Sequence, residues 1–346
     1  MLWRRRLPIS GLRMRAAALR DEILVECVGL AWDQWSQLGV SGAAPARREE
    51  RAADPEALLL FTLEIGRNDP RLFDEVLDWL SANEQLISVQ RLRNLCTGAA
   101  DAALVDAALA WSMRNRRPDP RTAADAPVQL EPLFTSAPSS GDDLDDAFAR
   151  HGFARTPLKA SGKSQAPRLR DPISFAFRLR RLLGVGVRAE AVRALLTIRA
   201  PRLSGRTITV SAAFAQRNVR EGLTHLLEAG VIEVVEIADD RQYAIDHTAW
   251  AALLGLPAAP ALPLHFDWIA TYRALVRIIR WLQQPVIDDL ADYLLASQAR
   301  TLVEELSSDL QRAGVPVGLY PALGPDFWDE FTEICRTTVR NATRAE

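Results

Sequence analysis

The chain has 346 residues, which is enough for two or three domains. Its 48% hydrophobic and 25% charged residues are ordinary for a globular protein, and no apolar run approaches the roughly 18 residues that a membrane helix needs. A net charge of −2 excludes a global basic field, so any surface for nucleic acid must be local.

The cysteines and the first residues indicate the compartment. Cys27, Cys96 and Cys335 lie far apart with no paired spacing, which is typical of a reducing compartment without a disulfide framework. The basic start of the chain lacks the apolar stretch of a signal peptide. We therefore expect a cytoplasmic protein with no membrane contact.

Residues 1–20 contain six arginines and no acid, and we interpret them as a basic tail. Such a tail is either a frayed terminus or an arm that contacts phosphate, and termini are usually disordered. Residues 21–114 are expected to form an N-terminal helical domain. Its first helix is predicted between Arg20 and Leu38, where apolar residues recur near one face.

Two Asp-Pro pairs, Asp54-Pro55 and Asp69-Pro70, predict helix starts within this domain, because aspartate accepts the free amides and proline suits the first helical position. Two further short helices are predicted over 88–96 and 102–113. The four helices are consistent with a bundle or with a second, degenerate helix-turn-helix. In the second case three polar side chains would be exposed on the third of these helices: Gln90, Arg91 and Arg93.

Residues 115–167 are predicted to be an acidic, proline-rich linker. Between Asp119 and Asp146 the chain holds seven acids and one arginine, a composition typical of extended or disordered segments. The acidic run over 142–146 lacks the glycine and the terminal glutamate of a calcium loop, so a solvated linker is favoured over a cation site.

Residues 168–255 carry the clearest pattern in the chain. Four apolar residues repeat at the spacing of one helix face: Val219, Leu223, Leu226 and Leu227. Gly230 then provides a helix stop, because glycine adopts the left-handed conformation without steric cost. A β-branched run over 231–237, a polar turn over 238–241 and a second run over 242–245 predict a hairpin. Helix, glycine, strand, turn and strand form the back half of a winged helix.

The front half of this domain is less strongly predicted. A helix over 190–199 is stopped by Pro201, and Ser204 can cap a short second helix that runs to about Ser211. Residues 212–214 would then be the turn before the third helix, as in a helix-turn-helix. The β-branched residues 207–210 leave a strand as an open alternative.

The segments Arg217–Leu223 (RNVREGL) and Leu226–Ile232 (LLEAGVI) resemble the recognition helix and first wing strand of bacterial winged helix-turn-helix regulators. The resemblance covers roughly residues 172–250 and is closest to GntR-like domains, with MarR-like and ArsR-like domains similar. It implies a DNA-binding transcriptional regulator. The chain departs from these families at Ala213, where glycine is common, and at Asp239 and Asp240, where a wing that binds DNA is usually basic.

The local charge balance changes along the proposed domain. Residues 155–206 hold thirteen basic and two acidic side chains, whereas residues 207–250 hold three basic and seven acidic ones. The positive charge therefore precedes the proposed recognition helix and avoids the wing. This suits helices and a flanking arm that grip phosphate. It also suits an arginine-rich surface in a chain that contains two lysines.

Residues 264–346 are expected to form a C-terminal helical domain. A heptad-like seam runs through Trp268, Tyr272, Leu275, Ile279 and Leu282. A long helix is predicted after Pro285, and a final helix over 325–340. The seam fits either packing within a bundle or a homodimer, and the resemblance implies a dimerisation or sensing role for such an appendage.

Motifs for catalysis are missing from the sequence. The histidines at 151, 225, 247 and 265 have no partner at the spacing of metal ligands, and there is no HExxH, CxxC, GxGxxG, GxxxxGK[ST] or GxSxG. We therefore expect no catalytic residues, no metal, no cofactor and no enzymatic activity.

The predicted fold class is a mainly α, multidomain helical protein with a central winged helix. Under the first hypothesis it is a transcriptional regulator that binds double-stranded DNA, with bases read from the third helix and phosphates held around it. The DNA-contacting candidates are Arg202, Arg206, Gln216, Arg217, Asn218, Arg220, Thr224 and Arg241. Under the second hypothesis the winged helix is a protein-docking or assembly module without sequence-specific DNA binding, which the acidic wing favours.

Overall fold

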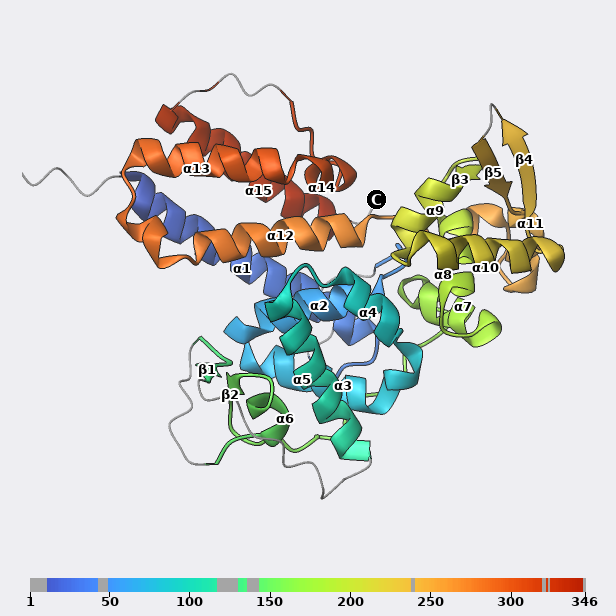
Figure 1. Cartoon of the computed structure of the whole chain (residues 1–346), viewed down its shortest axis with the longest axis horizontal. Helices are drawn as coiled ribbons and strands as arrows, with labels where there is room; N and C mark the ends of the chain where they lie inside the picture. Colours follow the sequence, from blue (N-terminus) through green and yellow to red (C-terminus); the bar gives the residue numbers. More distant parts are fainter. Residues whose placement is uncertain are drawn as a thin grey trace, which may run out of the picture. The chain divides into compact units, whose positions relative to one another are not determined.

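The computed structural model describes residues 11–42, 49–116, 130–135, 143–237, 240–318, 322 and 324–344 (Figure 1). Its elements are mainly helical with a few short strands, which confirms the predicted fold class. The chain divides into two compact units. The terminal unit combines the residues up to Leu30 with Asp267–Arg344, and the central unit is Ala31–Phe266. Over the described ranges, no helix is both long enough and apolar enough to cross a bilayer.

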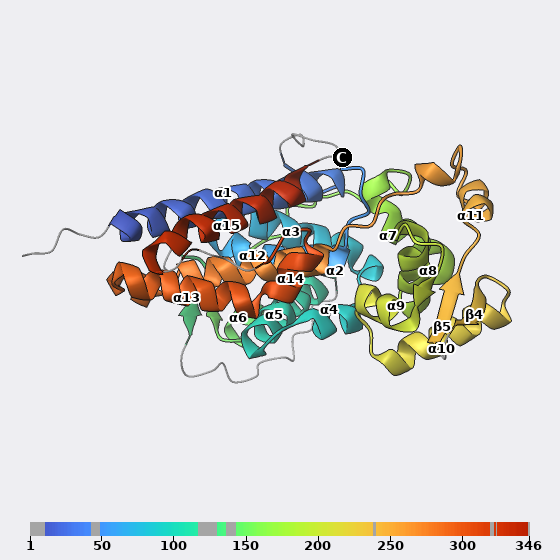
Figure 2. The same ribbon diagram turned by 90° about the horizontal axis from the view of Figure 1, so that it is seen from above.

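The terminal unit is a helical bundle built from both ends of the chain. Its elements are the first part of α1 (Gly11–Gln37), then α12 (Trp268–Leu282), η5 (Pro285–Asp289), α13 (Asp292–Glu305), α14 (Ser307–Arg312), η6 (Gly324–Asp326) and α15 (Phe327–Thr343). Figure 2 shows α15 alongside α1, where Arg336 donates to both carboxylate oxygens of Glu22 at 2.7 and 2.8 Å. The single long helix predicted after Pro285 is divided at Leu306 into α13 and α14.

The heptad-like seam of α12 packs against other helices of the same chain. All five seam residues are buried, and α12 packs against α14 and α15. On the same helix, Trp281 contacts the ring of Phe331 edge-on, with centroids 5.4 Å apart. The seam therefore packs within the bundle of one chain.

The first part of the central unit follows the helix starts predicted from the sequence. It contains α2 (Pro55–Ile65), η1 (Gly66–Asn68), α3 (Pro70–Asn83), η2 (Glu84–Leu86), α4 (Val89–Leu95) and α5 (Ala99–Arg116). Asp54 accepts the amide of Ala57 and Asp69 accepts those of Arg71 and Leu72, so both predicted caps are confirmed. The prediction of an exposed Arg91 is wrong, because its side chain is fully buried.

The predicted linker over 115–167 packs on these helices at Leu133 and over 145–155, whereas most residues of 156–166 are exposed and belong to no helix or strand. It forms β1 (Glu131–Pro132), α6 (Asp146–Ala149) and β2 (Phe153–Ala154), with β1 and β2 paired in parallel. Leu133 and Phe148 are fully buried, and the ring of Phe148 lies 5.9 Å from that of Phe73 on α3. The linker prediction is therefore wrong for these residues, because isolated apolar side chains among prolines and acids show no periodicity. Residues 117–129 and 136–142 lie outside the described residues.

The second part of the central unit is a winged helix (Figure 1). Its elements are η3 (Pro172–Ser174), α7 (Phe175–Leu183), α8 (Val187–Thr197), β3 (Leu203–Ser204), α9 (Gly205–Ala212), α10 (Gln216–Glu228), β4 (Glu233–Ile237), β5 (Asp240–Ala244), α11 (His247–Leu253) and η4 (Ala259–Ala261). The antiparallel sheet has the order β3-β5-β4, so the hairpin β4-β5 is closed by the short strand that precedes α9.

Local signals in this domain have clear structural counterparts. Ser204 accepts the amide of Thr207 at 3.1 Å and caps α9, so residues 207–210 are helical and the strand alternative is excluded. Gly230 has φ +67°, which confirms its role as the stop after α10. The second wing strand starts at Asp240, within the predicted turn, because Glu236 pairs with Arg241 in the β4–β5 ladder.

The core of the winged helix forms behind α10. Val219, Leu223 and Leu226 are buried on one face of that helix, as their spacing predicts. Gly222 lies on the side toward α8, where a Cβ atom would come within 2.9 Å of Cγ1 of Val187. The glycine therefore permits the close approach of α10 to α8 that fixes the three-helix arrangement.

Candidate nucleic-acid interface

The exposed face of α10 carries most of the predicted base-reading residues. Gln216, Arg217, Arg220 and Thr224 are all exposed, while the apolar face of the same helix is buried. Because residues three or four positions apart share a helix face, these side chains form a polar row on the solvent side of α10. Thr224 also bonds back to the carbonyl oxygen of Arg220 at 3.0 Å, which holds its hydroxyl against the helix.

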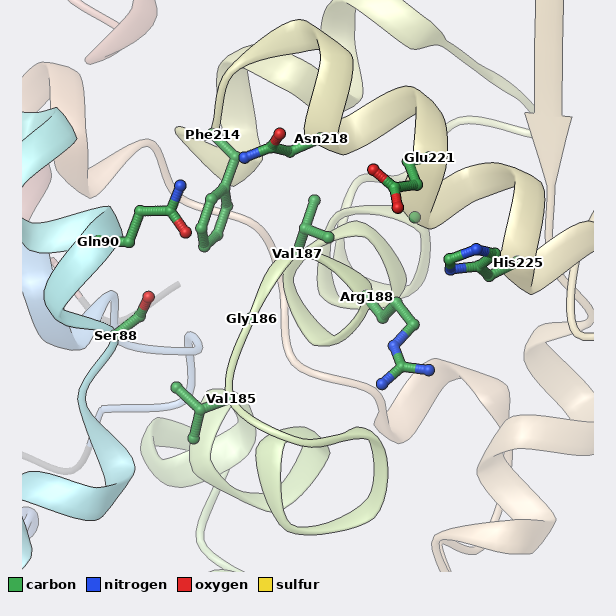
Figure 3. Close-up of a pocket in the computed structure, with 11 residues that line it drawn as sticks. Ser88, Gln90, Val185, Gly186, Val187, Arg188, Phe214, Asn218, Glu221 and His225 are labelled. Atoms are coloured by element: carbon green, nitrogen blue, oxygen red, sulfur yellow. The ribbon is translucent and has the colours of Figure 1, made fainter.

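Asn218 differs from these four residues because it is half-buried and lines a cavity of about 400 Å³ (Figure 3). The cavity lies between α4, the loop from α7 to α8, the start of α8, and α10. Its lining combines polar and apolar side chains, among them Gln90, Val187, Arg188, Phe214 and Glu221. Figure 3 shows the amide of Gln90 on the opposite wall from Asn218. The structure thus separates Asn218 from the outward row of α10.

The arginines proposed to hold phosphate occupy different settings. Arg202 is exposed immediately before β3, and Arg206 is exposed in the first turn of α9. Arg241 is exposed on the wing, where it forms an ion pair of 3.3 Å with Glu236. Exposed pairs of this kind contribute little. Within the described part of the chain, Arg202, Arg206, Arg217 and Arg220 have no such pair and remain available as cations.

The positive charge over 155–206 is smaller at the surface than the sequence count indicates. The side chains of Arg155, Arg180 and Arg193 are buried and carry part of that charge inside the protein. On the wing, Glu233, Glu236 and Asp240 are exposed. The remaining basic side chains, such as Arg181, Arg188, Arg202 and Arg206, are exposed on several elements, and the wing strands add negative charge.

Six buried ionised side chains join the N-terminal helices to the winged helix, and we call them the ionic cluster. Its members are Asp54, Glu56, Arg91, Arg180, Glu190 and Arg193. Three carboxylates meet three guanidinium groups, so the cluster has no net charge. None of the six side chains is more than 4% exposed. Each charge is thus compensated by hydrogen-bonded partners, as burial requires.

The cluster shifts the pKa values of its members. Burial alone raises the pKa of the Glu190 carboxyl, but the charges of Arg193, Arg180 and Arg91 outweigh burial and lower it. Burial likewise opposes ionisation of Asp54, yet Arg91 and Arg193 hold the pKa of its carboxyl below its usual range. Both carboxyl groups are therefore ionised at neutral pH, in the state that their arginine partners require.

The cluster also reaches the turn of the helix-turn-helix. Arg91 on α4 donates from Nε to the carbonyl oxygen of Ala212 at 2.8 Å, and Asn94 donates from Nδ2 to that of Ala213 at 3.1 Å. Ala213 has φ +54° and is the single non-glycine residue with positive φ among those described. The turn therefore keeps a left-handed backbone conformation at an alanine.

Sequence reasoning missed this arrangement because its contacts are long-range. Glu56 and Arg180 are 124 positions apart, and Arg91 and Ala212 are 121 apart. The one local signal is the spacing of Glu190 and Arg193, three positions apart on α8 within an otherwise apolar face. A charged pair embedded among alanines and leucines indicates a buried ion pair more strongly than a solvated face.

No group of three or more histidine, cysteine, aspartate or glutamate side chains is arranged to hold a metal ion within the described ranges. Burial raises the pKa of the Cys27 and Cys335 thiols, and burial together with Asp101 raises that of Cys96 to about 11. Thiols in this state are poor nucleophiles, since the thiolate is the reactive form.

Comparison with known proteins adds no family to this picture. No protein-family model matches the chain, and no curated protein and no solved structure is significantly similar to it.

Proposed function

We propose that this protein is a DNA-binding transcriptional regulator that reads double-stranded DNA with α10 of its winged helix. The observation that carries the proposal is the exposed polar row of Gln216, Arg217, Arg220 and Thr224 on the third helix of a helix-turn-helix, opposite a buried apolar face. The likeness of residues 172–250 to bacterial winged helix-turn-helix regulators supports the same assignment.

The chemistry of this row suits the edges of base pairs. Arginine donates in pairs to guanine, and glutamine pairs with adenine, in a major groove about 12 Å wide that admits a helix. Arg217 and Arg220 can therefore pair with guanine, and Gln216 can pair with adenine. Arg202, before β3, and Arg206, in the first turn of α9, are exposed, and in this proposal they contact phosphates and fix the register.

The wing is assigned no DNA contact in this proposal. Glu233, Glu236 and Asp240 are exposed on its strands, and carboxylates beside a phosphate backbone repel it. Arg241 is a basic residue among these acids, but its side chain forms an ion pair with Glu236. Sequence reading is therefore confined to α10, and phosphate binding to the arginines around α9.

A gel-shift experiment tests the proposal. The full chain is titrated into a duplex from its own upstream region and into a scrambled duplex of equal length, at several salt concentrations. We expect tighter binding to the native sequence and an affinity for both that falls as salt rises, because bound counterions are released. Failure to bind any duplex at low salt overturns the proposal.

Protein docking by the wing is the second candidate function. All five residues of β4 are exposed, and β4 is an edge strand of the sheet. Val234, Val235 and Ile237 are 39%, 39% and 48% exposed, which is unusual for β-branched residues. Edge strands with such side chains can pair with an added strand. If docking is the function, Val235→Lys abolishes capture of the partner, whereas Arg217→Ala leaves it intact.

A further inference from the structure

We infer that α4 of the N-terminal helices positions the recognition helix, with Asn94 and Arg91 as positioning residues for the turn between α9 and α10. This inference rests on the proposed function in one respect, the effect on DNA. Its structural part concerns the turn alone.

The turn needs outside partners because its own backbone leaves oxygens unpaired. The last carbonyl groups of a helix have no partner within it. At the end of α9 these oxygens belong to Ser211, Ala212 and Ala213, and each accepts from a side chain of another helix. Arg193 donates to Ser211 at 3.2 Å, Arg91 to Ala212 at 2.8 Å and Asn94 to Ala213 at 3.1 Å.

The conformation of Ala213 makes these partners more important. An L-residue with φ +54° is in the left-handed region, where its Cβ crowds the following carbonyl group. A residue held there persists when its surroundings over-determine it. Asn94 bonds directly to the carbonyl oxygen of this residue, and Arg91 bonds to the one before it.

The helix that supplies these donors is itself fixed. Arg91 is held by Asp54 and by Glu56, with Nη1 donating to Oε2 of Glu56 at 2.8 Å. The amide of Ser88, at the start of α4, donates to the same carboxylate at 2.7 Å. Moving α4 away from the turn would leave buried charges without partners, so α4 serves as a rigid support.

The recognition helix begins three residues after Ala213. Phe214 follows Ala213 directly. Its side chain is 7% exposed and packs into the core of the winged helix. The direction of α10 is therefore set by the turn, and the turn is set partly by α4. A change in the N-terminal helices would reach the base-reading row through Asn94 and Arg91.

The test uses the full chain with Asn94→Ala and a matched control, Gln90→Ala. Both remove an amide side chain from an exposed position on α4, and Gln90 has no bond to the turn. Hydrogen exchange is measured for the amides of 213–219, together with the unfolding midpoint. We expect exchange to accelerate roughly fivefold in Asn94→Ala, the effect of one neutral hydrogen bond, with little change in Gln90→Ala or in either midpoint.

The second readout is the ratio of affinities for the native and the scrambled duplex. Asn94→Ala is expected to lower this ratio by about fivefold, because a misdirected α10 loses base contacts and keeps phosphate contacts. Unchanged exchange overturns the inference whether or not the protein binds DNA. Faster exchange with an unchanged ratio overturns the role in reading DNA. Faster exchange in a protein that binds no duplex supports the positioning of the turn and overturns the proposed function instead.

Discussion

Arg180 of α7 and Glu56 of α2 face each other through two hydrogen bonds of 2.8 and 2.7 Å, with both side chains fully buried. This pair joins the winged helix to the N-terminal helices within the central unit. Because each charge is removed from water, its stability depends on the presence of the other. The pair therefore makes the folding of the two parts interdependent.

Neutralising Glu56 should destabilise the central unit strongly. In Glu56→Gln the guanidinium groups of Arg91 and Arg180 lose a buried anionic partner, and breaking such a pair costs about 3–5 kcal/mol. The change is measured as the free energy of unfolding in urea. Glu236→Gln is the control, because its pair with Arg241 is exposed and is worth about 1 kcal/mol or less. Equal effects of the two substitutions would contradict the account.

Acid should weaken the ionic cluster. The pKa values of Glu190 and Asp54 are lowered in the folded protein from their usual values of 4.5 and 3.8. A depressed folded pKa contributes stability that is present above the unfolded pKa and is lost as pH falls toward the folded one. The difference in unfolding free energy between wild type and Glu190→Gln should therefore be constant near neutral pH and narrow below about pH 4.5. If this difference in unfolding free energy stays constant down to pH 3, the Glu190 carboxylate does not stabilise the protein through its ion pairs.

Replacing Ala213 with glycine should stabilise the turn. An L-residue in the left-handed region costs about 1–2 kcal/mol, and glycine loses about 0.5–1 kcal/mol more chain entropy on folding. The expected net gain in the free energy of unfolding is about 0.5–1 kcal/mol. Ala229→Gly provides the control, because Ala229 has φ −79° and should lose stability on the same change. Loss of stability in both variants would show that Ala213 is not strained.

Gly222→Ala should destabilise the winged helix although alanine is the better helix former. The added Cβ would lie 2.9 Å from Cγ1 of Val187, and overpacking of this kind costs about 1–3 kcal/mol against a gain in helix propensity of about 1 kcal/mol. The melting temperature of the double variant Gly222→Ala, Val187→Ala separates the two effects. Recovery relative to Gly222→Ala alone is expected, and a further decrease would argue against a clash.

Local signals in the sequence account for much of the fold. Asp54, Asp69 and Ser204 cap helices because a short side-chain oxygen at a helix start can accept backbone amides that have no partner within the helix. Gly230 ends α10 because a residue without Cβ adopts the left-handed backbone conformation at no steric cost. The apolar spacing of Val219, Leu223 and Leu226 faces the core as periodicity requires.

The sequence failed where single residues act over long distances. A second helix-turn-helix over the N-terminal helices would expose Arg91, but the carboxylates of Asp54, Glu56 and Glu190 surround its side chain. Leu133 and Phe148 are buried in an acidic, proline-rich stretch, and Phe148 packs against Phe73 of α3. Asn218 lies between the base-reading candidates in the sequence, but its side chain is half-buried and lines the cavity between α4, α8 and α10. None of these contacts produces a periodic pattern in the sequence from which it could be predicted.

The most direct test of DNA reading by α10 compares two classes of arginine variant. Arg217→Ala and Arg220→Ala remove base-reading candidates, whereas Arg202→Ala and Arg206→Ala remove phosphate-binding candidates. Binding of each to the native and the scrambled duplex is measured across a salt series. We predict that the first class loses about 1–3 kcal/mol on the native duplex and little on the scrambled one, and that the second weakens both alike and flattens the salt dependence. Equal losses on both duplexes for Arg217→Ala and Arg220→Ala would contradict sequence reading by α10.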